Sequence, residues 1–130
     1  MLPPLTKLLR DTLWVLATNL FAGLVVDMSL GAAQRGTLIW YLAVTLTNGV
    51  LCITVFFILA HLAATNRFVH VWTVAALASL LTLVLVAGRD DMTLSTFLVT
   101  VALYLACATI GGGLSYAFRR SRRTADGSVV

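Results

Sequence analysis

Four long apolar segments constrain this chain more than any other feature of its sequence. They cover residues 12–30, 38–60, 69–87 and 94–118. A helix rises about 1.5 Å per residue, so about 20 apolar residues cross a hydrocarbon core about 30 Å thick. Each segment is close to or above that length, and none alternates between polar and apolar residues as a spanning strand does. The pattern predicts four transmembrane helices.

Composition excludes an ordinary soluble domain. Hydrophobic residues make up 60% of the 130-residue chain and charged residues only 11%, against about 45–50% and about 25% in soluble proteins. The sequence therefore predicts an all-α, integral membrane four-helix bundle that occupies residues 1–123 as a single domain. Residues 5–11 are expected to form a short interfacial lead-in. The polar tail over residues 124–130 is expected to be disordered on the cytoplasmic side.

The distribution of basic residues predicts the orientation of the bundle. With four spans, both termini and the connection between the second and third spans lie on the same side of the membrane. Seven of the nine Lys and Arg residues fall on that side, namely Lys7, Arg10, Arg67, Arg119, Arg120, Arg122 and Arg123, whereas Arg35 and Arg89 fall on the other. Short cytoplasmic segments carry the excess of positive charge in membrane proteins. We therefore expect both termini in the cytoplasm and a multi-pass protein of the cell (inner) membrane.

Polar and small residues recur at helical spacing inside the predicted spans. They are Asn19, Gly23 and Asp27 in the first, Thr45 and Asn48 in the second, and Thr100 and Tyr104 in the fourth. Polar side chains that face lipid are unfavourable, so these residues are expected to turn inward and form a polar seam. One interpretation is a seam that only holds the helices together through hydrogen bonds. A second is a substrate path around Asn19 and Asn48, and a third is a seam that faces another subunit.

Asp27 is the only carboxylate inside a predicted span. It lies about one helical turn from the outer end of that span, where it can reach Arg35 or lipid headgroups. We therefore interpret it as an interfacial charge. No charged residue falls at the centre of a predicted span, which argues against proton-coupled transport.

Small residues also indicate where helices approach closely. Gly23, Cys107, Gly111 and Ser115 are expected to pack against neighbouring helices, because small side chains let backbones come together. The glycine triplet over residues 111–113 lacks the Lys-Ser/Thr ending of a phosphate-binding loop. We expect the two cysteines, Cys52 and Cys107, to serve packing, because buried thiols are poor nucleophiles and metal ligands.

The C-terminal arginines follow the last span directly. Arg119, Arg120, Arg122 and Arg123 are interpreted as an orientation signal that holds lipid headgroups, with anionic lipid as the favoured partner. They are not interleaved with aromatic residues, so we expect no nucleic-acid binding.

Motifs for catalysis or cofactor binding are missing from the sequence. It contains no glutamate and no GxSxG, HExxH or CxxC pattern. His61 and His70 fall at similar depth on the cytoplasmic side, but a hairpin edge is a poor site for bis-histidine haem ligation. We interpret them as interfacial histidines, and we expect no enzyme activity, no cofactor and no metal.

These features favour a non-enzymatic accessory, assembly or interaction subunit of a membrane complex. Its partner would be another membrane protein or a further copy of this chain. The first alternative is a small homo-oligomeric transporter or flippase that uses the polar seam around Asn19 and Asn48. A holin-like pore former is a further alternative, suggested by the small size and the basic tail.

Overall fold

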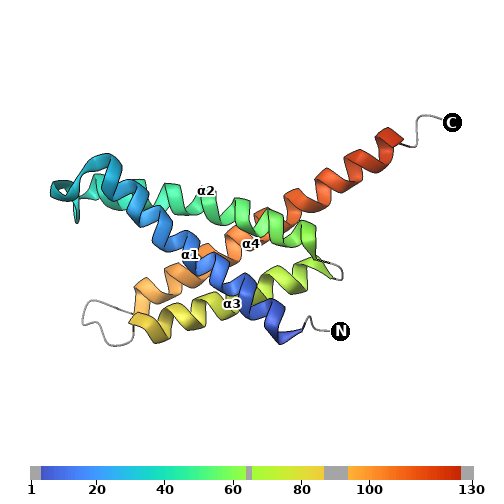
Figure 1. Cartoon of the computed structure of the whole chain (residues 1–130), viewed down its shortest axis with the longest axis horizontal. Coiled ribbons are helices and arrows are strands. Elements are labelled where there is room, and N and C mark those ends of the chain that lie inside the picture. The colour runs from blue at the N-terminus through green and yellow to red at the C-terminus, as the bar shows by residue number, and fades with distance from the viewer. Residues whose placement is uncertain (1–3, 64–65, 87–93, 127–130) are drawn as a thin grey trace.

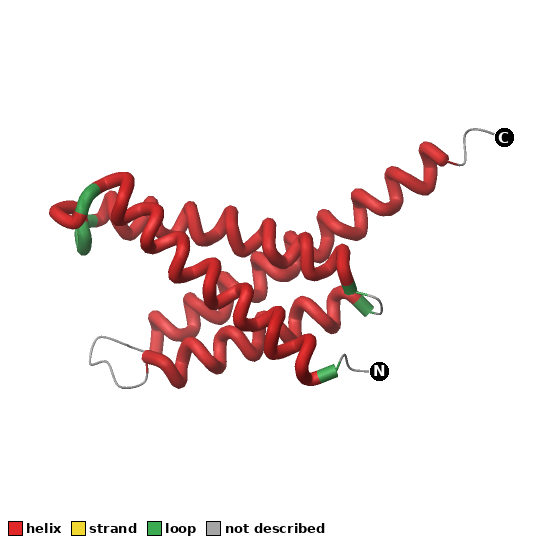
Figure 2. Tube along the Cα trace, viewed as in Figure 1, coloured by secondary structure: helices red, strands yellow, loops and turns green. Residues whose placement is uncertain are grey.

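The computed structural model describes residues 4–63, 66–86 and 94–126, and the regular secondary structure in these ranges is entirely helical. The four long helices are α1 (Leu5–Leu30), α2 (Leu38–Leu62), α3 (Arg67–Val86) and α4 (Leu94–Asp126). A short 3-10 helix, η1 (Ala32–Gln34), joins α1 to α2 (Figure 1 and Figure 2). Each long helix is long and apolar enough to cross a membrane, so the expectation of an all-helical chain with four such helices is confirmed.

Helix α1 begins at Leu5, earlier than the apolar pattern predicted. Pro4, at its start, has φ −59° and is already set for a helix. No further glycine or proline occurs before Gly23, so nothing in the sequence interrupts the helix. The expected interfacial lead-in over residues 5–11 is therefore a continuous part of α1.

Helix α4 ends later than predicted. It passes through the glycine triplet and continues to Asp126. No glycine or proline occurs between Gly113 and Asp126, and arginine and alanine favour helix formation. Residues 124–126 of the expected disordered tail are therefore helical, while residues 127–130 lie outside the described part of the chain.

Consecutive helices run in opposite directions (Figure 1), so the start of α1, the end of α2, the start of α3 and the C-terminal half of α4 lie toward the same end of the bundle. One end carries Lys7, His61, Arg67 and Arg119, and we call it the basic end. There the Lys7 ammonium group lies 3.5 Å from the carbonyl oxygen of Leu62, and the Arg119 guanidinium group 3.4 Å from that of His61. These two contacts supply donors to the free carbonyl groups that end α2.

The four helices are tightly packed at the basic end and in the middle but separate toward the other end. Helices α1 and α4 each pack against both α2 and α3. Toward η1, the α1–α2 pair diverges from the α3–α4 pair, while the C-terminal part of α4 extends past the other helices (Figure 1). The end of the bundle that contains η1 is called the η1 end below.

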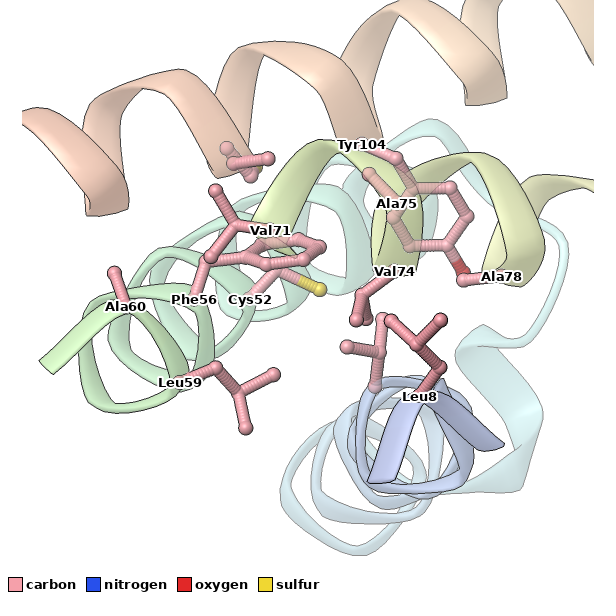
Figure 3. Close-up of a cluster of buried hydrophobic side chains, with 13 residues drawn as sticks. Leu8, Cys52, Phe56, Leu59, Ala60, Val71, Val74, Ala75, Ala78 and Tyr104 are labelled. Carbon is pink, nitrogen blue, oxygen red and sulfur yellow. The ribbon is translucent and has the colours of Figure 1, made fainter. Parts of the chain in front are cut away.

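The hydrophobic core follows the same division. Its buried residues are Leu8, Val15, Cys52, Phe56, Leu59, Ala60, Val71, Val74, Ala75, Ala78, Tyr104, Cys107 and Ala108 (Figure 3). Among the described side chains, α2 has no buried residue before Cys52 and α4 none before Tyr104. The core therefore occupies the middle of the bundle and the half toward the basic end.

At Gly111, helices α4 and α2 come into close contact in this core. A Cβ atom added there would lie 2.8 Å from the carbonyl oxygen of Ile53 and 2.8 Å from the backbone nitrogen of Phe57. Only glycine therefore lets the backbones of α4 and α2 touch at this point.

Candidate functional site

A pocket of about 490 Å³ lies between the helices, in the middle of the bundle and toward the η1 end. All four long helices contribute to its wall. Its lining residues are Leu16, Asn19, Leu20, Val44, Thr45, Asn48, Gly49, Cys52, Thr82, Leu85, Thr100, Leu103, Tyr104 and Cys107. The volume falls within the range of about 300–1,000 Å³ that is typical of small-molecule sites.

The predicted polar seam therefore converges on one pocket. Asn19, Thr45, Asn48, Thr100 and Tyr104 all line it. The amide nitrogen of Asn19 donates a hydrogen bond to the Tyr104 hydroxyl group, which links α1 to α4 across the pocket. Thr82 of α3 lines the pocket as well, and its hydroxyl group donates a hydrogen bond to the carbonyl oxygen of Ala78.

Cys52 lies between the two asparagines. Its sulfur is 3.5 Å from Oδ1 of Asn48 and 3.8 Å from Oδ1 of Asn19, and its single thiol proton can be donated to either oxygen. The second thiol, that of Cys107, is 3.9 Å from the carbonyl oxygen of Gly49. Both cysteines are free, and no sequence pattern indicated that Cys52 would lie between Asn19 and Asn48.

Two polar groups on α2 keep unused hydrogen-bonding capacity in the pocket. Among the described residues, neither the Asn48 amide nitrogen nor the Thr45 hydroxyl group makes a hydrogen bond. Three residues apart, they lie on the same face of the helix. They can therefore donate to an oxygen atom of a molecule in the pocket.

The rim of the pocket is apolar and open to the outer surface. Leu20 of α1 is 78% exposed and Leu85 of α3 is 72% exposed. Both line the pocket, and we call the part of its opening that they border the mouth; exposed Thr45 of α2 and Leu103 of α4 also line the pocket. No charged side chain occurs among the lining residues of the described chain.

A second cluster, at the basic end, was not anticipated from the sequence. Oδ2 of Asp11 lies 2.8 Å from Nε2 of His70, and Oδ1 accepts hydrogen bonds from Arg10 at 2.7 and 2.9 Å. Asp11 is 1% exposed and His70 2% exposed. The pair joins α1 to α3 inside the bundle, so the interpretation of His70 as an interfacial histidine was wrong.

The early start of α1 explains why this pair was missed. Asp11 was placed before the first span, whereas it lies within α1 on the buried stripe that also contains Leu8, Thr12 and Val15. The spacing of three, four and seven residues is that of a helix face. Together with Pro4 as a helix-start signal, this spacing could have revealed the buried position of Asp11.

Asp27 pairs with Arg35, one of the two partners that its position suggested. Their carboxylate and guanidinium groups approach to 2.5 Å, and the indole nitrogen of Trp40 donates to Asp27 at 2.7 Å. The hydrogen bond to this carboxylate raises the pKa of Arg35 above its usual value. The cluster fastens the α1–α2 hairpin at the η1 end and does not line the pocket.

The residues predicted to pack between helices have different surroundings. Gly111 lies at the α4–α2 contact, and Ser115 is fully buried with Arg67 3.5 Å from its hydroxyl group. Cys107 is buried at the pocket wall. A Cβ atom at Gly23, by contrast, would meet nothing within 4 Å, so Gly23 makes no close helix contact within this chain.

The C-terminal arginines extend along the exposed end of α4. Arg119 and Arg120 are exposed, and Arg119 also reaches the carbonyl oxygen of His61. The side chains of Arg122 and Arg123 lie outside those that the structure describes.

Among the described residues, no group of three or more His, Cys, Asp or Glu side chains could hold a metal ion. His61 is half-buried, stacks on Phe57 and leaves its Nδ1 atom without a hydrogen-bond partner.

Comparison with known proteins gives no relative from which to transfer a function. No family model matches the chain, and neither a curated protein nor a solved structure is significantly similar to it.

Proposed function

We propose that this chain is a multi-pass membrane protein whose basic end faces the cytoplasm. Leu20 and Met28, which are 78% and 79% exposed, illustrate an apolar outer surface that suits acyl chains better than water. Lys7, Arg67 and Arg119 lie together at one end, as the positive-inside rule requires of a cytoplasmic face. A bacterial inner membrane fits this arrangement.

Within that membrane, the proposed function is the binding and transfer of a small uncharged amphipathic molecule, as in a small transporter or flippase. The observation that carries the proposal is the pocket. All four helices place polar side chains around it, and two donors, on Asn48 and Thr45, have no partner among the described residues. Thr45 is exposed and Asn48 is half-buried, so both groups are accessible to a molecule that enters the pocket.

The chemistry of the pocket defines the class of molecule. Its polar groups are amides, hydroxyls and thiols, so they suit a head with hydroxyl or carbonyl oxygens. A charged head would meet no opposite charge among the lining residues, and its burial there would be unfavourable. The exposed leucines at the rim let an apolar tail remain among the acyl chains.

An accessory subunit remains the second candidate function. The observation that favours it is the C-terminal part of α4, which continues to Asp126 beyond the other helices and carries exposed arginines (Figure 1). Such an extension offers a surface to a partner protein or to anionic lipid.

Native mass spectrometry of the full chain, extracted from its membrane in a mild detergent, separates the two candidates. We expect a bound non-protein species that remains through purification and is lost in Asn48→Leu. The matched control is Thr54→Leu on the same helix. Thr54 is exposed, and its hydroxyl group donates only to the backbone carbonyl oxygen of Val50, one turn earlier. A bound second polypeptide and no small molecule would support the accessory role instead.

Transfer is tested separately in liposomes with a fluorescent ceramide, which has an uncharged head, and a fluorescent phosphatidylserine, which has a charged one. We expect the chain to move the ceramide between leaflets faster than empty liposomes do, and Asn48→Leu to remove the difference. Equal rates for both probes, or no effect of the variant, would contradict the proposed mechanism.

A further inference from the structure

The buried Asp11–His70 pair has no role in the pocket, yet it joins the same two helices that frame the pocket mouth. We propose that Asp11 and His70 bind a proton at the basic end. The bound proton strengthens the contact between α1 and α3 and thereby controls how far the mouth opens. The link to the mouth rests on the proposed function of the pocket, whereas the proton site itself does not.

Burial and hydrogen bonding make the pair a suitable proton site. Both side chains are at most 2% exposed, and each oxygen of Asp11 has one partner, His70 on one side and Arg10 on the other. Histidine is the side chain that ordinarily gains or loses a proton near neutral pH. The side chain of Arg10 is 61% exposed, so solvated surface lies only one side chain away from the buried carboxylate.

The proton changes the charge of the cluster by one unit. With neutral His70, the negative Asp11 and positive Arg10 sum to zero. A proton taken from the aqueous phase at the basic end binds Nδ1 of His70, because Nε2 already faces Asp11. The cluster then carries +1, and the proton returns to the same phase when it leaves. No other bond forms or breaks.

The surroundings make Asp11 necessary for this step. The other charged or titratable groups that the structure describes at the basic end are Lys7 on α1, His61 on α2, Arg67 on α3, and Tyr116, Arg119 and Arg120 on α4. None of them is a carboxylic acid, so Asp11 is the one carboxylate among the described side chains that can stabilise a second positive charge here. The expectation from the sequence concerned only charged residues at the centre of a span, whereas Asp11 lies near the start of α1.

Protonation also changes the strength of the contact between α1 and α3. The carboxylate of Asp11 is charged in both states, and a proton on His70 adds the attraction between opposite charges to the hydrogen bond. The two helices pack together through this pair at the basic end and carry Leu20 and Leu85 at the pocket mouth. Loss of the proton therefore weakens the Asp11–His70 contact. Helices α1 and α3 can then move further apart at the pocket mouth.

Two measurements on the full chain in lipid nanodiscs test the proposal, and neither needs a pocket ligand. Histidine side-chain NMR follows protonation between about pH 5 and pH 8. The chain has only two histidines, so His61→Asn assigns the His70 signal. Electron spin resonance follows the distance between labels at Leu24→Cys and Val84→Cys, exposed positions near the mouth that do not line the pocket, in a Cys52→Ser/Cys107→Ser background.

We expect the His70 signal to titrate and the distance between the labels to increase as the proton is lost. Asp11→Asn and His70→Gln should each abolish the pH dependence of the distance, and His70→Gln retains a hydrogen-bond donor if the first variant fails to fold. Asp27→Asn removes the carboxylate that pairs with the exposed Arg35 at the other end of α1, and it should leave the pH dependence of the label distance intact. A single protonation state of His70 throughout, or a distance that does not follow it, would overturn the proposal. Failure to find a pocket ligand would count only against the proposed function.

Discussion

The two halves of the bundle are built from the same four helices but are held together differently. Toward the basic end, small residues bring backbones into contact at Gly111, and a buried charged pair joins α1 to α3. Toward the η1 end, polar uncharged side chains span a pocket, and the charged pair Asp27–Arg35 fastens only one hairpin. The half toward the basic end is packed, and the half toward the η1 end contains the pocket.

The comparison shows how an apolar bundle can reserve space for a ligand. Helices that lack a hydrophobic driving force between them associate through close packing and polar contacts. Where small residues are present, packing closes the bundle. Where asparagine, threonine and tyrosine replace them, the helices are linked by hydrogen bonds over a longer distance, and a cavity remains. Substitutions in the two halves should therefore have unequal effects.

The largest effect is expected at Gly111. Its replacement by leucine inserts a side chain against the backbone of α2, which cannot move aside as a flexible side chain would. We expect a loss of stability at the upper end of about 1–3 kcal/mol, measured by denaturant unfolding in detergent. Gly113→Leu is the matched control, because a Cβ atom there meets nothing within 4 Å. Equal losses in both variants would show that α4 does not rely on close contact at Gly111.

Removal of the buried carboxylate should have the next largest effect. Asp11→Ala leaves the buried His70 nitrogen without its acceptor, and an unsatisfied buried group destabilises by about 1–3 kcal/mol. Asp27→Ala removes the other carboxylate of α1, whose partner Arg35 is exposed, so its effect should be clearly smaller. The same unfolding assay compares them, and a larger loss for Asp27→Ala would reverse the assignment of the two halves.

A smaller effect is expected at the pocket itself. Tyr104→Phe removes the hydroxyl group that accepts from Asn19, and hydrogen bonds between membrane helices contribute about 0.6–1.7 kcal/mol. Tyr116→Phe, at an exposed position of the same helix, is the control. If the two variants unfold alike, the contact across the pocket does not hold α1 to α4.

The number of helices and five residues of the pocket wall could be predicted from local patterns, whereas Asp27 of the predicted seam does not line the pocket. Length and apolarity identify each helix, and spacings of three and four residues place Asn19, Thr45 and Tyr104 on inward faces. The Asp11–His70 pair depends on two residues 59 positions apart and on the exact start of α1. Helix starts are the least certain part of a sequence pattern, so a charged residue near such a start is easily placed outside the bundle.

The partners of each polar group also needed the three-dimensional arrangement. Helical spacing does not show how Asn19 and Asn48 are connected, and the structure places Cys52 between them. The hydroxyl group of Tyr104 reaches Asn19 because α1 and α4 face each other across the pocket. Such contacts depend on the crossing angles between helices, and these angles cannot be derived from the spacing of residues along one helix.

The most direct test of the central claim is protection of the pocket by an uncharged amphiphile. Thr100→Cys places a thiol on the pocket wall, and Thr109→Cys places one on an exposed face of the same helix, each in a Cys52→Ser/Cys107→Ser background. Labelling by a small maleimide is measured in nanodiscs with and without dioctanoylglycerol. The account predicts slower labelling at position 100 only, and no protection by the anionic dioctanoyl phosphatidate. Equal labelling of both positions under all conditions would contradict a binding pocket.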